Sequence, residues 1–345
     1  MPEFVHGLDL SEHFYRDVIA PRLVGTSHAA ALLGWGSDIL GFDTPRSIDH
    51  GFGPRLQVFV TSDEVEDTRA AIDADLPGEY RGFPVRFGWD DTPVTHHVEV
   101  TTLARYLSGR LGFDPREGVG TDEWLSTPHQ LLLGMTRGRV FRDPEGELDD
   151  VREALTWYPS DVWLYLLAAQ WRRIEEEEAF VGRTSEVGDE LGSRIVAARL
   201  ARDVMRLCFL LEREYAPYSK WLGSAFARLA AADAVQPALT QALAAQSYAE
   251  REAGLVAAYE AVARRHNALG LTVAVEPSAR LFYGRPFRVI DGTRFVAACR
   301  GAIVDDDLRN RPLTGAIDQW ADSTEVLSNA PLAQRAGRSL ARFDG

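Results

Sequence analysis

Two short apolar runs, Ala29 to Leu33 and Leu56 to Val60, enclose a polar, glycine-rich stretch. The first run stops at Gly34-Trp35-Gly36-Ser37-Asp38, and the acid Asp49 precedes the second run. Apolar runs of this length between turn residues are typical of buried strands. The order strand, small-residue turn, acid, strand suits a loop that cradles a phosphate while a nearby carboxylate holds a metal ion.

The hydrophobic pattern changes near residue 147. Before it, further strands are predicted at 84–89, 96–100 and 138–141, between helices at 12–23, 62–77 and 102–111. After it the pattern is helical, with the longest helices expected at 161–178, 186–214 and 248–269. We therefore expect an α+β fold, with a short mixed sheet in an N-terminal domain (1–147) and an all-α C-terminal domain (148–345). Within the second domain, the charge run from Glu175 to Glu178 is expected to be a solvated helix face.

Composition excludes several classes of protein. A hydrophobic content of 46% and a charged content of 26% are those of a globular protein, and no apolar run reaches the roughly 18 residues of a membrane span. A net charge of −14 argues against a general nucleic-acid binder, but a small nucleotide needs only a local basic pocket. The N-terminus does not resemble a signal peptide, and Cys208 and Cys299 lie in apolar surroundings, so a cytoplasmic protein without a membrane partner is expected.

The chain contains a single lysine, Lys220, among 37 basic residues. It lies between Tyr218 and Trp221 at the start of a predicted helix. Lysine and arginine differ where a compact ammonium must reach a phosphate, so Lys220 is a candidate ligand; the alternative is a surface lysine.

Two features point to phosphate and metal chemistry. Gly36 and Ser37 follow a strand and offer backbone N–H groups and a hydroxyl to an anion, although glycine in a tight turn is the simpler interpretation. Nucleotidyl transfer needs Mg²⁺ held by carboxylates on adjacent strands. Asp49 precedes one strand, and Glu99 lies between Val98 and Val100 on another; Glu99 could equally face solvent.

These residues resemble a known sequence pattern. Gly36-Ser37, Ser47-Ile48-Asp49, the run from Leu56 to Val60 and Val98-Glu99-Val100 resemble the nucleotidyltransferase pattern of the DNA polymerase beta superfamily. Residues 46–55 are similar to a bacterial group of that superfamily whose central domain has no known function, as are residues 215–222 and 315–319. Residues 140–148 resemble the segment between the catalytic and helical domains of antibiotic nucleotidyltransferases.

The resemblance implies transfer of a nucleoside monophosphate from an NTP, most simply ATP, to a small-molecule hydroxyl, with Mg²⁺ or Mn²⁺ as cofactor. Asp49 and Glu99 would be the catalytic, metal-holding residues. The nucleotide and its phosphates would be held by Gly36, Ser37, Arg55 and Lys220. Further candidates are Asp38, His50, Tyr218 and Arg285.

One position departs from the superfamily pattern, in which two acids form an Asp-x-Asp motif. Here Asp49-His50-Gly51 has glycine at the second acid position. The chain could therefore be a one-metal enzyme or a catalytically silent nucleotide sensor. A modifier that nucleotidylates a partner protein is a third possibility. His96 and His97 have no third zinc-like ligand nearby in the sequence, so core or turn roles are expected.

Overall fold

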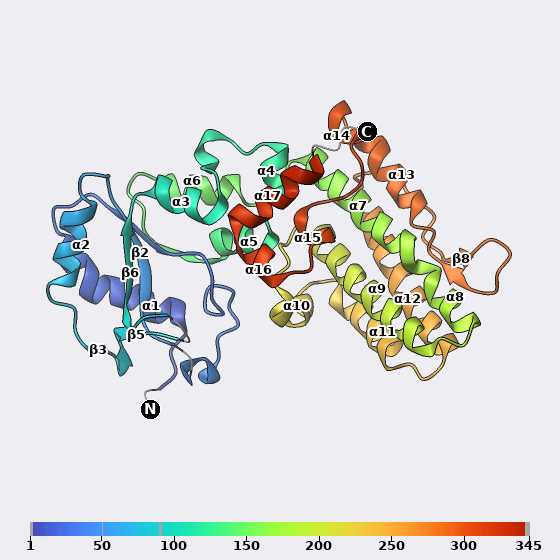
Figure 1. The fold of residues 1–345 in the computed structure, drawn as a ribbon, viewed down its shortest axis with the longest axis horizontal. Helices are drawn as coiled ribbons and strands as arrows, with labels where there is room; N and C mark the ends of the chain where they lie inside the picture. Colours follow the sequence, from blue (N-terminus) through green and yellow to red (C-terminus); the bar gives the residue numbers. More distant parts are fainter. Residues whose placement is uncertain (1–2, 50, 90–91, 342–345) are drawn as a thin grey trace. The chain divides into compact units, whose positions relative to one another are not determined.

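The computed structural model describes residues 3–49, 51–89 and 92–341, and it divides into two compact units (Figure 1). Unit 1 comprises Met1–Glu123, Thr127–Thr156 and Glu325–Arg335. Unit 2 comprises Trp124–Ser126, Trp157–Thr324 and Ala336–Gly345. The predicted boundary at residue 147 lies inside unit 1, whose second segment continues to Thr156.

Unit 1 is built on a mixed sheet, as predicted, with strand order β5-β6-β2-β1-β7. The antiparallel pairs are β1 with β2, β1 with β7 and β5 with β6, whereas β2 and β6 are parallel. A separate ladder joins β3 (Glu79–Tyr80) to β4 (Phe83–Pro84). The strands of the main sheet are β1 (Ala29–Leu32), β2 (Arg55–Phe59), β5 (Arg86–Phe87), β6 (Thr95–Thr101) and β7 (Arg139–Arg142).

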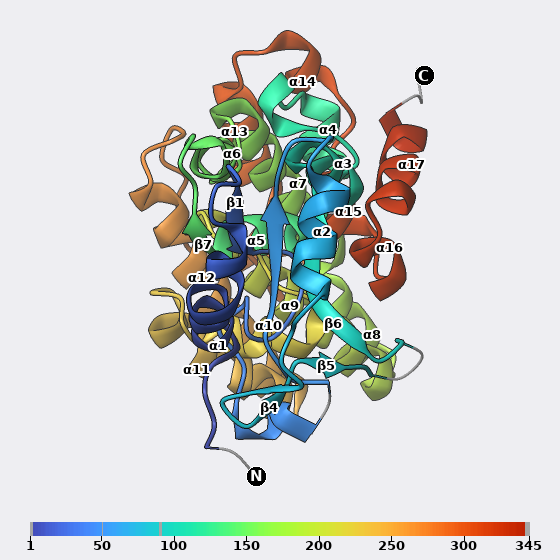
Figure 2. The same cartoon turned by 90° about the vertical axis from the view of Figure 1, so that its left-hand side faces the viewer.

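One face of this sheet packs against helices to form the apolar core of unit 1. Leu56, Val58, Val98 and Val100 alternate along β2 and β6 and pack there. The N-terminal helical segment covers them, as α1 (Gly7–Phe14) continues through a π-helical turn (Tyr15–Ile19) and a 3₁₀ turn (Ala20–Leu23). Helix α2 (Val65–Asp73) covers the same face (Figure 2). Gln57 and Glu99, which alternate with these apolar residues, therefore belong to the opposite face.

Helices of unit 1 also follow β6 and β7. They are α3 (Leu103–Leu111), α5 (His129–Arg137) and α6 (Glu147–Ala154), with α4 (Thr121–Ser126) divided between the units. Helix α5 approaches the end of β1 so closely that only glycine fits at the contact. A Cβ on Gly134 would lie 2.1 Å from the carbonyl oxygen of Gly34. This contact fixes where the chain leaves β1.

Unit 2 is a helical bundle, as predicted. Helix α7 packs on α9 and α13, and α12 packs on α9 and α11 (Figure 1). One feature departs from the all-α prediction, a short hairpin of β8 (Arg280–Leu281) and β9 (Arg288–Val289). The helices are α7 (Ser160–Glu178), α8 (Phe180–Glu186), α9 (Glu190–Leu211), α10 (Ser219–Phe226), α11 (Ala232–Ala244), α12 (Tyr248–Ala268), α13 (Thr293–Ala302), α14 (Asp306–Asn310) and α15 (Ile317–Trp320). Helices α16 (Thr324–Ser328) and α17 (Ala330–Ala341) are divided between the units.

The prediction that Glu175 to Glu178 form a solvated helix face is wrong for Glu178. Glu178 is buried, and its carboxylate accepts hydrogen bonds from the backbone N–H groups of Ile290, Asp291 and Gly292 at 2.6–3.1 Å. The other three glutamates pair with arginines, as expected of a solvated face. Glu178 therefore joins the end of α7 to the start of α13.

Candidate functional site

The chain leaves β1 in a turn whose shape requires glycine. Gly34 has φ +105° and Gly36 has φ +137°, values that side chains rarely adopt. The N–H of Leu33 donates to Oε1 of Gln57 at 2.9 Å, and the N–H of Gly34 donates to the carbonyl of Gly134 at 3.0 Å. The end of β1 is thus anchored on both sides before the turn begins.

A single helical turn follows and leaves its first N–H groups unused. It is closed by bonds from Leu40 to Gly36 (3.2 Å), from Gly41 to Asp38 (3.1 Å) and from Phe42 to Ser37 (2.7 Å). The backbone N–H groups of residues 35–39 make no hydrogen bond to another described residue. Backbone donors at the start of a helical turn are the kind of group that binds anions.

Arg55 supplies a cation directly beside this turn. Its Nε and Nη2 donate to the two carboxylate oxygens of Asp38 at 3.2 and 2.6 Å, and Nη2 also donates to the carbonyl of Trp35 at 2.6 Å. The guanidinium lies over the Trp35 ring, 4.8 Å from its centroid. The side chains of Arg55 and Asp38 are only 15% and 11% exposed. A Cβ on Gly36 would lie 2.0 Å from Nη2, so the guanidinium rests against the glycine.

The predicted residues Gly36, Ser37, Asp38 and Arg55 therefore come together. Because β2 and β6 are parallel and in register, Arg55 pairs with His97 and Gln57 pairs with Glu99 on the same sheet face. The Nε2 of His97 lies 2.9 Å from the carbonyl oxygen of Phe87. Burial lowers the pKa of His97, and the nearby Arg55 lowers it further, so the imidazole is neutral at pH 7.

Two aromatic residues that sequence reasoning missed, Trp89 and Tyr106, also lie beside this turn. Trp89 contacts Trp35 edge-on (ring centroids 5.2 Å apart) and also lies against His97 (5.0 Å). Tyr106 of α3 is buried, and its hydroxyl has no hydrogen-bond partner in the described part of the chain. A Cβ on Gly34 would lie 3.2 Å from that hydroxyl. Burial raises the pKa of Tyr106 far above its usual value, so it stays protonated.

Each of the two predicted metal ligands pairs with an arginine. Asp49 ends a 3₁₀ helix (Pro45–Asp49) before β2, is 58% exposed and pairs with Arg46 at 3.5 Å. Glu99, in β6, is 44% exposed and pairs with Arg110 of α3 at 3.3 Å. No group of three or more histidine, cysteine, aspartate or glutamate side chains within residues 3–49, 51–89 and 92–341 could hold a metal ion. The described donors therefore do not fit a two-ion site.

Gly51, at the position where the resemblance predicts a second acid, leaves little space for a side chain. Its φ is +60°, and a Cβ there would lie 2.8 Å from Cε3 of Trp89. The indole thus occupies the space that an aspartate side chain would enter. Two other acids nearby in the sequence are also engaged: Asp38 pairs with Arg55, and Asp43 lies 3.0 Å from Nδ1 of His6 and accepts from the N–H of Gly7. His50 lies outside the described residues.

The other predicted ligands belong to unit 2. Tyr218 precedes α10, and Lys220 lies in its first turn with its ammonium 5.0 Å from the centroid of the Trp221 ring. Arg285 follows β8 and pairs with Glu186 at 3.3 Å. A role for these residues in nucleotide binding stays a prediction.

A family model described as a domain of unknown function, DUF4037, matches residues 124–222, which run from α4 into α10. That part of the resemblance, a central domain of unknown function, is confirmed.

A solved structure is also similar to the chain, the crystal structure of a nucleotidyltransferase-like protein from Exiguobacterium sibiricum 255-15. The two are 12% identical, and the similarity covers 75% of this chain and 77% of that one with a TM-score of 0.33. No curated protein sequence matches the chain. No helix among the described residues is long and apolar enough to cross a membrane.

Proposed function

We propose that unit 1 binds the phosphates of a nucleoside triphosphate, with ATP the simplest candidate, over the turn at residues 34–38. The observation that carries this proposal is the row of unpaired N–H groups at residues 35–39 beside the Arg55 guanidinium. Backbone donors in a turn and an adjacent arginine are two elements that recur in phosphate sites. The Ser37 hydroxyl adds a further donor at the same place.

Asp38 fits this role as a positioning residue. Its carboxylate holds Nε and Nη2 of Arg55, which leaves Nη1 without a partner among the described residues. That nitrogen is the donor available to a phosphate oxygen. A fixed guanidinium loses little conformational entropy when it binds an anion, so the pair prepares the site before the ligand arrives.

A second candidate function is transfer of the nucleoside monophosphate to a small-molecule hydroxyl, and Glu99 favours it. Its exposed carboxylate lies on the Arg55 face of the sheet, where it can act as general base on an acceptor. The reaction requires Mg²⁺ or Mn²⁺ with Asp49 and Glu99 as ligands. Because the described donors do not form that site, nucleotide binding without turnover is what the geometry supports best.

The test of binding is calorimetric titration with ATP, with and without Mg²⁺. We expect Arg55→Lys to weaken ATP binding by about tenfold, because an ammonium cannot both pair with Asp38 through two nitrogens and reach a phosphate. The matched control is Arg105→Lys on α3, at an exposed arginine outside the site. Equal affinities for wild type and Arg55→Lys would overturn the proposal. Unchanged affinity in Lys220→Ala would remove Lys220 from it.

The test of transfer uses NTP labelled at the α-phosphate, Mg²⁺ or Mn²⁺ and a mixture of metabolites. Binding without label transfer supports the silent nucleotide-binding protein. Label in a small molecule that disappears in Asp49→Ala and Glu99→Gln supports the transferase. Label that enters protein supports a modifier of a partner protein.

A further inference from the structure

Trp35, in the turn of the proposed phosphate site, leaves much of its side chain in solvent. The chain has eight tryptophans, and Trp35, at 48% exposure, is more exposed than any other. A covered indole buries roughly 150–250 Å², so leaving about half of the residue in water forgoes much of that stabilisation. Tryptophans that are rigid and partly exposed are typical of sites that bind a ligand or a partner.

The indole of Trp35 is held by contacts with two side chains. The Arg55 guanidinium lies over the ring, 4.8 Å from its centroid, and Arg55 is itself fixed by two hydrogen bonds to Asp38. Trp89 meets the ring edge-on, with the centroids 5.2 Å apart and the planes at 67°. A cation over the ring and one edge contact leave the exposed part of the indole free to stack on a ligand.

Trp89 connects this indole to the sheet. Its ring centroid lies 5.0 Å from that of His97 in β6 and 6.1 Å from that of Phe87 in β5, and these two rings are 4.2 Å apart. Phe87 is buried, so Trp35 is the outer end of an aromatic row that begins in the sheet. A ring held in this way loses little conformational entropy when a ligand stacks on it.

The same row places the indole beside the donors of the phosphate site. The N–H of Trp35 is the first of the unbonded N–H groups at residues 35–39, and the guanidinium over the indole also rests against Gly36. In a nucleotide, a single ribose separates the base from the α-phosphate. A nucleotide whose phosphates contact this turn therefore carries its base within reach of the indole.

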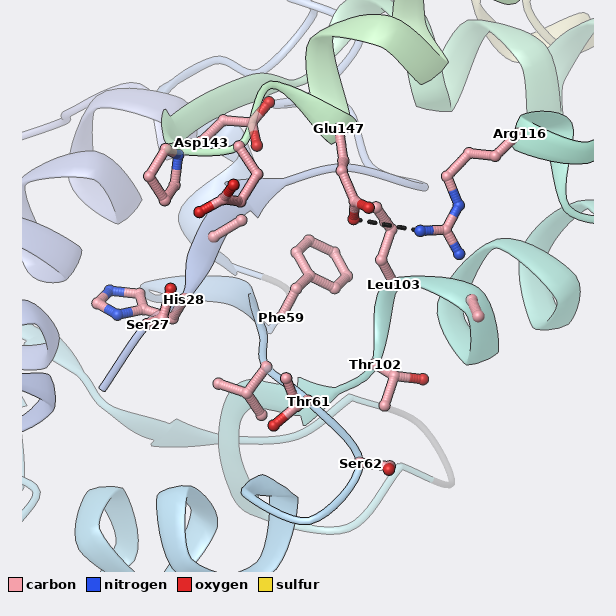
Figure 3. Close-up of a pocket in the computed structure, with 15 residues that line it drawn as sticks. Ser27, His28, Phe59, Thr61, Ser62, Thr102, Leu103, Arg116, Asp143 and Glu147 are labelled. Carbon is pink, nitrogen blue, oxygen red and sulfur yellow. Dashed lines mark hydrogen bonds and ion pairs between the residues drawn. The ribbon is translucent and has the colours of Figure 1, made fainter. Parts of the chain in front are cut away.

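A cavity at the other end of β1 is less suited to a nucleotide. It has a volume of about 470 Å³, and residues 27–29 at the start of β1 form part of its wall. Figure 3 shows Asp143 and Glu147 on one side of its Phe59 ring. These carboxylates repel a triphosphate. Phe59 is 4% exposed, so it offers little of its face to a base.

We propose that the Trp35 indole stacks on the base of the bound nucleotide, so that the site selects nucleotides over other polyphosphates. Stacking at Trp35 presupposes the proposed binding of a nucleoside triphosphate at residues 34–38. Stacking on an aromatic side chain strengthens the binding of a nucleobase by about tenfold or more, because every base has a π-face.

Calorimetric titration with ATP and with inorganic triphosphate, under the same conditions, separates stacking from phosphate binding. Wild type should bind ATP about tenfold more tightly than triphosphate. Trp35→Ala should remove this difference, weakening ATP binding and leaving triphosphate binding unchanged, whereas Trp35→Phe should retain part of it. Trp320→Ala, at the other exposed tryptophan, on α15 of unit 2, is the matched control and should bind both ligands as wild type does.

Tryptophan emission gives a second readout. ATP should quench the emission of wild type more than triphosphate does, and this difference should vanish in Trp35→Phe. A Trp35→Ala protein that binds ATP as tightly as wild type would overturn stacking. Equal losses of ATP and triphosphate binding would also overturn it, because Trp35 would then only support the turn. If wild type binds neither ligand, the proposed function itself is wrong, and stacking is refuted with it.

Discussion

The glycine at position 36 allows the Arg55 guanidinium to lie against the main chain of the turn. Any larger residue must displace Arg55 or Asp38, because its Cβ would lie within 2.2 Å of both side chains. It would also have to adopt φ +137°. The turn and the arginine therefore form a single structural unit.

We expect Gly36→Ala to destabilise unit 1 by about 2 kcal/mol, through backbone strain and the loss of the buried Arg55–Asp38 pair. Gly109→Ala, in the middle of α3 where a Cβ meets no atom within 4 Å, should instead stabilise it by about 0.5–1 kcal/mol. Urea unfolding of both variants checks this. A Gly36→Ala protein as stable as wild type would show that the pair does not depend on the turn.

Trp89 fills the space beside Gly51. We expect Gly51→Asp to destabilise unit 1 by about 1–3 kcal/mol, because its Cβ would lie 2.8 Å from the indole. In a Trp89→Ala background the same substitution should cost much less, which a double-mutant cycle measures. Independent, additive effects would show that Trp89 does not fill the space of the second acid.

At the scale of elements, the sequence predicted the positions of the strands better than it predicted which residues pack beside them. The apolar runs at 29–33 and 56–60 and the alternation around Glu99 placed β1, β2 and β6 to within about two residues of their observed ends. These signals are local, whereas the role of Trp89 depends on a loop folding back over Gly51. Tyr106 lies at a core position of α3, so nothing in the sequence distinguishes its hydroxyl from an ordinary buried tyrosine.

Glu178 is another residue whose contacts could not be predicted from local sequence signals. Helical periodicity does not reveal that its carboxylate binds the backbone at the start of α13, since the two segments are separated by more than 100 residues. Only the fold brings Ile290–Gly292 to the end of α7.

This connection between α7 and α13 predicts a pH dependence. Burial, opposed by three hydrogen bonds from the backbone, raises the pKa of Glu178 to about 7 from 4.5. The folded state therefore holds this proton where the unfolded chain releases it. The contribution of protonated Glu178 to the free energy of unfolding is therefore complete below pH 4.5 and is lost as the pH rises through 7.

Between pH 5 and 8, the free energy of unfolding of wild type should fall by about 2 kcal/mol more than that of Glu178→Gln. Chemical unfolding of both proteins across this range checks the sign. The Glu176→Gln variant, on the exposed face, is the control and should follow wild type. Parallel pH profiles for Glu178→Gln and wild type would contradict a raised pKa.

At the scale of the molecule, the predicted fold class was correct. A mixed-sheet unit carries the candidate phosphate site, and a helical unit carries Lys220. The sequence singled out Gly36, Ser37 and Arg55 because they lie beside the ends of predicted strands, and their role in phosphate binding stays a prediction. It did not show that Asp49 and Glu99 each pair with an arginine, because that depends on the path of the loop before β2 and on the position of α3.

Amide hydrogen exchange of the full chain, with and without ATP, tests the central claim most directly. The N–H groups of residues 35–39 have no hydrogen-bond partner among the described residues, so they should exchange rapidly in the free protein. ATP should slow their exchange by at least tenfold and leave the buried helices α9 and α12 unchanged. ATP that binds while exchange at residues 35–39 stays the same would contradict the account.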